Sequence, residues 1–146
     1  YKAFVSMGPE PLGDSFDGKY LKAATKDRKA PIKQLLLDQK TVAGLGNIYV
    51  CEALHMSGIS PRKAGGKISK PKYNTLVESV KQVLTAAIAA GGSSLRDFVQ
   101  PDGELGYFAK DWLVYGREGE TCHCGATIKR RVDSGRSTFY CSNCQK

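Results

Sequence analysis

Apolar residues recur at three- and four-residue spacing in four segments of the chain, which is the pattern of amphipathic helices. The longest segment covers about residues 70–90, and Gly91-Gly92 ends it. Shorter helices are predicted from Asp14 or Ser15 to about residue 26, over about 31–39 with Pro31 in the first turn, and over about 47–56. A further short element is expected from Ser93 or Ser94 through residue 99.

The last part of the chain has a different pattern. Two short strands are expected over about 126–132 and 137–141, joined by Asp133-Ser134-Gly135. Residues 100–106 contain proline, aspartate and two glycines, which predicts a loop. The expected fold is therefore mainly α, with a small C-terminal β-hairpin.

Length and composition limit the class of protein. The chain has 146 residues, enough for one ordinary domain or two small ones. No apolar run approaches the roughly 20 residues of a membrane helix, and no charged-then-apolar secretory leader is visible. The first residue is Tyr1 rather than methionine, so we expect a fragment or a processed product.

The formal net charge is +8. Basic residues outnumber acidic ones in three separate blocks, over residues 19–33, 60–82 and 110–146. Separated basic blocks suit a polyanion such as DNA, whose phosphates supply affinity independent of sequence. A solvated basic surface without a special purpose is the alternative that charge alone leaves open.

Four of the five cysteines lie close together near the end of the chain, as Cys122-His-Cys124 and Cys141-Ser-Asn-Cys144. Clustered cysteine pairs without a secretory signal indicate a metal site, and four thiolates make a closed tetrahedral zinc site. The first pair is irregular, because an extended Cys-x-Cys would point its thiols to opposite faces. A turned backbone could bring them together, or His123 could replace one thiolate. Cys51, far upstream, is expected to be a buried core thiol.

The stretch from Val42 to Tyr49 places two glycines directly before a predicted helix. A helix N-terminus of this kind offers free N–H groups and a positive dipole end to a phosphate. Asn47 could add a side-chain donor, and Lys33 lies on the preceding helix. A plain connector between two helices is the alternative interpretation.

Several motifs in order resemble the formamidopyrimidine-DNA glycosylase family. They include Pro31-Ile-Lys-Gln-Leu-Leu-Leu-Asp-Gln, Gly44-Leu-Gly-Asn-Ile-Tyr, Asp102-Gly-Glu-Leu-Gly-Tyr-Phe and Gly135-Arg-Ser-Thr-Phe-Tyr-Cys-Ser-Asn-Cys. The resemblance implies a helix–two-turn–helix DNA-binding architecture with one structural zinc. It divides the chain into a linker (1–13), a helical domain (14–112) and a zinc finger (113–146).

The resemblance also implies an activity. Members excise oxidised purines, namely 8-oxoguanine and formamidopyrimidines, from a flipped nucleotide, and then cut the abasic site by β,δ-elimination. A bacterial, cytoplasmic, monomeric protein acting on double-stranded DNA is expected. An oxidised-pyrimidine glycosylase of the sister family, a non-catalytic nucleic-acid-binding module and a purely structural zinc domain are the alternatives.

Residue roles follow from the resemblance position by position. Asn47 corresponds to an asparagine that binds a backbone phosphate near the lesion, within a turn that includes Gly46 and Tyr49. Arg136 corresponds to a finger arginine that contacts phosphate and is linked to the elimination steps. Basic positions at the DNA backbone correspond to Arg28, Lys29 and Lys33. The loop over the flipped base corresponds to Gln100, Asp102, Gly103, Gly106, Tyr107 and Phe108.

Two features depart from the family pattern. The nucleophile of the family is an N-terminal proline, which works with an adjacent glutamate and a lysine. None of the 146 residues corresponds to these, since Pro9-Glu10 is internal and its proline nitrogen is an amide. The shortened first cysteine pair is the second departure, and it makes Cys122 the least secure zinc ligand.

Overall fold

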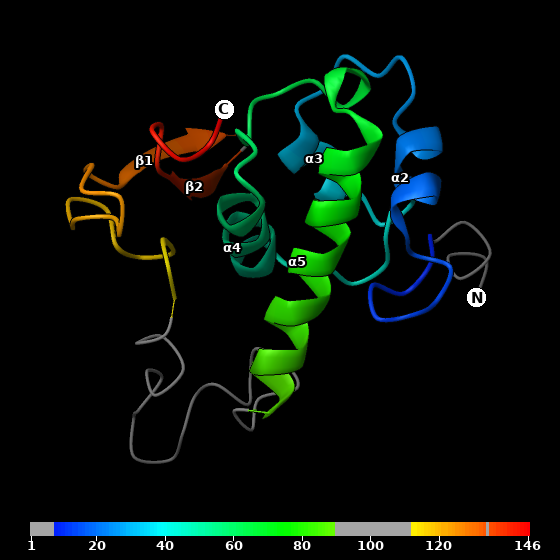
Figure 1. The fold of residues 1–146 in the computed structure, drawn as a ribbon, viewed down its shortest axis with the longest axis horizontal. Coiled ribbons are helices and arrows are strands. Elements are labelled where there is room, and N and C mark those ends of the chain that lie inside the picture. Colours follow the sequence, from blue (N-terminus) through cyan, green and yellow to red (C-terminus); the bar gives the residue numbers. More distant parts are fainter. Residues whose placement is uncertain (1–7, 90–111, 134) are drawn as a thin grey trace.

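The computed structural model describes residues 8–89, 112–133 and 135–146 (Figure 1). Within these ranges the fold is mainly helical and ends in a two-stranded antiparallel hairpin, as predicted. The elements are α2 (Gly18–Ala24), α3 (Ile32–Leu37), α4 (Asn47–Ser57), η1 (Gly65–Lys67), α5 (Lys70–Ala89), β1 (Lys129–Asp133) and β2 (Arg136–Tyr140). The predicted short element after Ser93 or Ser94 lies outside the described residues.

The long helix α5 is the centre of the arrangement. Helix α2 packs on one side of it and α4 on another, and α4 also contacts strand β2 (Figure 1). Helix α4 therefore lies between the helical core and the hairpin.

Local signals set the helix ends. Helix α2 begins later than predicted, because Asp17 rather than Asp14 or Ser15 caps it: the Asp17 carboxylate accepts from the Tyr20 N–H at 2.7 Å. Helix α4 begins at Asn47 as predicted. It ends at Gly58, whose φ of 72° is the left-handed conformation that glycine adopts without a Cβ clash.

The main hydrophobic core lies between α2, α3, α4 and α5. Tyr73 of α5 is fully buried, and its hydroxyl donates to the Gly65 carbonyl at 2.8 Å, so its polar end is satisfied. Other members from the four helices are Leu21, Ile32, Leu36, Leu54, Leu76 and Val80, and Phe16 joins them from the segment before α2. Trp112 joins the same core from beyond α5.

A second, smaller core lies under the hairpin and contains Cys51, Val114, Cys122, Ile128, Phe139 and Cys141. Cys51 is 1% exposed, which confirms the prediction of a buried thiol. Strand β1 begins at Lys129 rather than near Ala126. The reason is that the Ala126 carbonyl accepts from the Cys122 N–H at 2.7 Å, inside a turn of the cysteine region.

Candidate metal centre and nucleic-acid interface

The sulfurs of Cys122, Cys124, Cys141 and Cys144 all lie within 4.8 Å of one another. The Cys124 and Cys141 sulfurs are 3.5 Å apart, and those of Cys122 and Cys144 are 3.7 Å apart. Four thiolates on a tetrahedron with zinc–sulfur bonds of about 2.3 Å would be separated by about 3.8 Å. The four side chains therefore have the spacing that one structural Zn²⁺ requires.

A tight turn explains how the shortened first pair converges. The Gly125 N–H donates to the Cys122 carbonyl at 2.8 Å, and Gly125 has a φ of 95°. This turn keeps the backbone between Cys122 and Cys124 from being extended. Cys122, the least secure ligand in the sequence, is buried and lies with the other three.

Gln145 closes the second pair, and sequence reasoning missed it. Its side-chain Oε1 accepts from the Cys141 N–H at 2.8 Å, and its Nε2 donates to the Ile59 carbonyl at 2.9 Å. One amide therefore shapes the second cysteine turn and connects it to the segment after α4.

Hydrogen bonds within the cluster shift the pKa values of two thiols in opposite directions. A backbone hydrogen bond from Ala126 lowers the pKa of Cys124 to about 6. Hydrogen bonding with Cys124 raises the pKa of Cys144 to about 12. Thiolates this close repel one another, so all four ionise together only around a positive ion.

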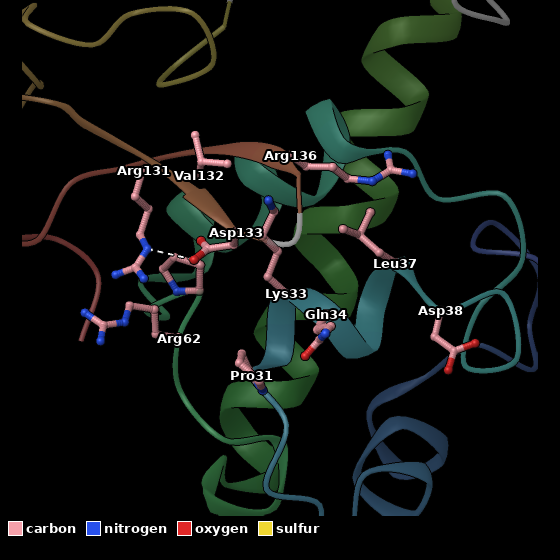
Figure 2. Close-up of a pocket in the computed structure, with 11 residues that line it drawn as sticks. Pro31, Lys33, Gln34, Leu37, Asp38, Arg62, Arg131, Val132, Asp133 and Arg136 are labelled. Atoms are coloured by element: carbon pink, nitrogen blue, oxygen red, sulfur yellow. Dashed lines mark hydrogen bonds and ion pairs between the residues drawn. The ribbon is translucent and has the colours of Figure 1, made fainter.

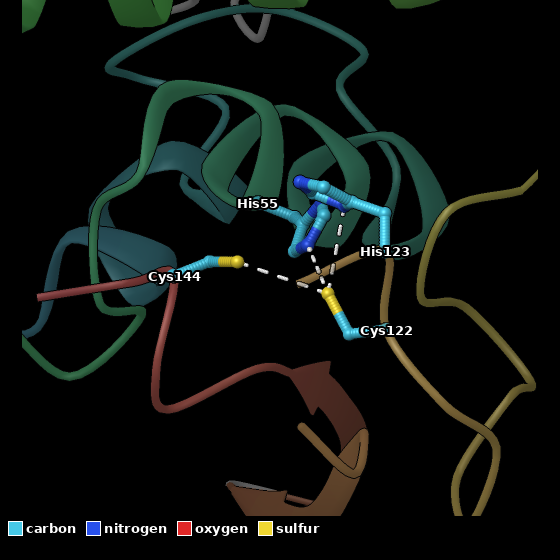
Figure 3. A group of neighbouring side chains, drawn as sticks. All are labelled: His55, Cys122, His123 and Cys144. Carbon is cyan, nitrogen blue, oxygen red and sulfur yellow. Dashed lines mark hydrogen bonds between the residues drawn. The ribbon is translucent and has the colours of Figure 1, made fainter. Parts of the chain in front are cut away.

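Two histidines lie beside the same sulfurs (Figure 3). His55 Nε2 is 3.5 Å and His123 Nδ1 is 3.6 Å from the Cys122 sulfur. These nitrogens and the sulfurs of Cys122 and Cys144 also lie within 4.8 Å of one another. Burial lowers the pKa of His55, with smaller contributions from His123 and Arg117.

Lys33 and the hairpin form a chain of hydrogen bonds. Lys33 is 4% exposed, and its Nζ donates to Thr138 Oγ1 at 2.6 Å and to the Ser137 carbonyl at 3.3 Å. The Thr138 hydroxyl donates to Asp133 Oδ2 at 2.8 Å, and Arg131 donates to Asp133 Oδ1 at 2.9 Å. Burial lowers the pKa of Lys33. Helix α3 is thus connected to both strands of the hairpin.

Asn47, at the start of α4, makes a second connection to the hairpin. Its Nδ2 donates to the Ser137 carbonyl at 2.9 Å. Its Oδ1 is buried and has no hydrogen-bond partner among the described residues. The same carbonyl of β2 therefore accepts from Lys33 and from Asn47, which fixes the hairpin relative to two helices.

These connections border an open pocket of about 730 Å³ between α3, residues 61–62 and the hairpin. Figure 2 shows the side chains at this pocket, with the Arg131–Asp133 ion pair. Its charged lining is formed by Lys33, Arg62, Arg131, Arg136, Asp38 and Asp133. Basic groups outnumber acidic ones, so the pocket suits an anionic ligand.

The other predicted DNA-binding residues are distributed differently. Arg28 and Lys29 are exposed on the turn after α2 and do not line the pocket. Gly46 is the N-cap of α4. Tyr49 is 9% exposed and packs edge-on against Trp112, with ring centroids 6.1 Å apart. The predicted lesion loop, Gln100 to Phe108, lies outside the described residues.

Glu52 of α4 is a buried carboxylate to which sequence reasoning assigned no role. It accepts three backbone N–H bonds, from Leu113 at 2.7 Å, Val114 at 2.8 Å and Tyr115 at 3.0 Å. Burial raises the pKa of Glu52, although these bonds and Arg117 work against the increase. The carboxylate holds the segment that leads into the cysteine region against α4.

Two protein-family profiles match the sequence. The formamidopyrimidine-DNA glycosylase H2TH domain matches residues 7–99, and the zinc finger found in FPG and IleRS matches residues 119–146. The second match and the four clustered sulfurs agree on one structural zinc. None of the described helices has the length and apolar character needed to cross a membrane.

Close relatives of the chain are formamidopyrimidine-DNA glycosylases of bacteria. The chain is 64% identical over 143 residues to a formamidopyrimidine-DNA glycosylase of Rhizorhabdus wittichii, covering 98% of this chain and 53% of the relative. It is 62% identical over 146 residues to that of Sphingopyxis alaskensis, covering 100% and 54%. The chain thus spans about half the length of the curated relatives it matches.

Solved structures extend the likeness to the fold. The MutM (Fpg) protein of Thermus thermophilus matches with a TM-score of 0.85 and 40% identity, over 97% of this chain and 54% of that one. The Lactococcus lactis Fpg, in a complex with DNA that contains an abasic site, matches with a TM-score of 0.87 and 37% identity, over 99% and 54%.

Proposed function

Because the chain belongs to the formamidopyrimidine-DNA glycosylase family, we propose that it is the DNA-binding portion of a bifunctional glycosylase and AP lyase that removes oxidised purines. Its helical and zinc-finger parts bind double-stranded DNA around 8-oxoguanine or formamidopyrimidine. Solved structures similar to this chain include complexes of the Lactococcus lactis Fpg with DNA that contains an abasic site or Fapy-dG.

The observation that carries this proposal is the shared attachment of the hairpin. Lys33 and Asn47 donate to one carbonyl of β2, that of Ser137, which directly follows Arg136 in the sequence. A phosphate-binding arginine benefits from a fixed backbone, because a segment that becomes ordered only on binding loses conformational entropy. The helices and the finger therefore bind the DNA backbone together as one surface.

The residues have separate roles in this proposal. Asn47 binds a backbone phosphate together with the turn that contains Gly46 and Tyr49. Arg136 binds a second phosphate and assists elimination. Arg28 and Lys29 extend the basic surface, and the loop Gln100–Phe108 covers the flipped base. The linker, helical domain and finger divide at residues 13 and 112, and the protein acts as a monomer in the bacterial cytoplasm.

DNA binding by Arg136→Ala tests the proposal. Fluorescence anisotropy with a duplex that contains 8-oxoguanine measures the Kd, and metal analysis measures zinc. Loss of one phosphate contact is expected to weaken binding about tenfold. It should also reduce the slope of log Kd against log salt concentration by about one, because one counterion fewer is released on binding. Lys129→Ala is the matched control, since Lys129 is exposed on β1 and does not line the pocket. Equal affinity of the two variants would argue against this role of Arg136.

Covalent trapping tests the assignment of the nucleophile. The 146 residues are expected to bind the 8-oxoguanine duplex without cutting it, because none of them supplies the proline amine of the family. Borohydride reduction during incubation traps any Schiff base between protein and sugar. A trapped adduct on this chain would refute the assignment.

A further inference from the structure

His55 and His123 form a second group of metal ligands with Cys122 and Cys144 (Figure 3). His55 comes from α4, whereas His123 lies between the two cysteines of the first pair. Two sulfurs, those of Cys122 and Cys144, belong to this group and to the four-cysteine group as well. The chain thus offers two ligand sets that share one edge.

The distances around Cys122 fit both sets. In a tetrahedral zinc site with bonds of about 2.0 Å to nitrogen and 2.3 Å to sulfur, a nitrogen and a sulfur lie about 3.5 Å apart and two sulfurs about 3.8 Å. The Cys122 sulfur is 3.5 Å from His55 Nε2, 3.6 Å from His123 Nδ1 and 3.7 Å from the Cys144 sulfur. All three separations match a site with two histidines and two cysteines.

The surroundings of His55 point to the sulfur as its partner. The residue is 4% exposed, and its Nδ1 has no hydrogen-bond partner among the described residues. The other ring nitrogen faces the Cys122 sulfur, and the ring packs edge-on against His123, with centroids 5.5 Å apart. A buried imidazole whose polar contact is a metal-binding sulfur is placed as a metal ligand would be.

We propose that one Zn²⁺ can be held by either of two ligand sets: four cysteines, or Cys122 and Cys144 with His55 and His123. Two cysteines, Cys124 and Cys141, belong to the first set alone. Cys124 is exposed and Cys141 is buried. When Cys124 is lost, the metal moves to the histidines and the finger stays folded. The second set also connects the metal to α4, the helix that begins with Asn47.

Zinc content and cobalt spectra test the proposal on three variants of the full chain. Cys124→Ser removes a ligand of the first set alone. Cys124→Ser/His55→Phe removes one ligand from each set, and Cys122→Ser removes a shared ligand. His55→Phe is the matched control, because it leaves four cysteines and replaces one buried ring by another.

The expected results differ between the variants. Cys124→Ser and His55→Phe keep about one zinc per chain, whereas Cys122→Ser and the double variant lose it. With Co²⁺ in place of zinc, the sulfur-to-metal charge-transfer absorbance of Cys124→Ser is expected to fall to about half that of the unchanged chain, because two thiolates are replaced by imidazoles. Loss of zinc from Cys124→Ser would overturn the proposal. Retention of zinc by both Cys124→Ser and the double variant would also overturn it, because His55 would then not be needed to hold the metal.

Discussion

Replacing Glu52 by alanine is expected to detach the segment that leads into the zinc finger. The side chain is 2% exposed and accepts the N–H groups of three consecutive residues, Leu113, Val114 and Tyr115. Glu52→Ala leaves these donors without their acceptor. Water can reach only some of them, since Val114 is fully buried while Leu113 is 38% exposed.

The structure allows the cost to be worked out. A hydrogen bond to a charged group contributes about 1.5–3 kcal/mol, so three bonds contribute roughly 4.5–9 kcal/mol. Removing the carboxylate also abolishes the cost of its burial, which is several kcal/mol. The expected net loss in the free energy of unfolding is therefore about 3 kcal/mol. In a chain of this size that corresponds to a fall in Tm of very roughly 10 °C.

Urea denaturation followed by two probes measures this loss. Circular dichroism at 222 nm follows the helices, and fluorescence follows Trp112, the single tryptophan, which lies directly before the bound segment. Glu78→Ala on the exposed face of α5 is the control and should change stability by less than about 0.5 kcal/mol. A loss below about 1 kcal/mol for Glu52→Ala would refute the reasoning, because the three bonds would then contribute nothing net.

Three further predictions concern pH, the hairpin and the metal. Because the pKa of Glu52 is raised on folding, the folded chain favours the protonated carboxyl, and the part of the stability that depends on this proton is lost as pH rises through the folded value. The free energy of unfolding of the unchanged chain should therefore fall relative to Glu52→Gln as pH rises above about 4.5, while the three hydrogen bonds to the carboxylate remain. A constant difference would contradict this. Thr138→Val should lower the free energy of unfolding by about 1–3 kcal/mol, because Lys33 loses its closest acceptor, and it should weaken DNA binding. Thr85→Val on the exposed face of α5 should do neither. Chelation of zinc should abolish DNA binding yet leave most of the helical circular dichroism. The small core under the hairpin contains zinc-binding cysteines, whereas the core between the helices does not. Complete loss of the helical signal would show that the helices also need the metal to fold.

Much of the fold could be predicted because its signals are local. Helix α4 begins at Asn47 and α5 at Lys70, as the apolar periodicity indicated. Helix α2 begins later than predicted, since three nearby residues could cap it and only the folded chain selects Asp17. Strand β1 is shorter at its start because the Cys122–Ala126 turn uses backbone groups that the pattern had assigned to the strand.

The sequence by itself determined the helices, the hairpin, the four cysteines and the family motifs, because periodicity, capping and ligand spacing depend on residues a few positions apart. Only the tertiary structure decided what Lys33, Glu52, His55 and Gln145 do. Lys33 donates to a threonine 105 positions away, and Gln145 reaches a carbonyl 86 positions away. A buried charge or imidazole is stable only where the fold brings a partner to it, and no local pattern specifies that partner.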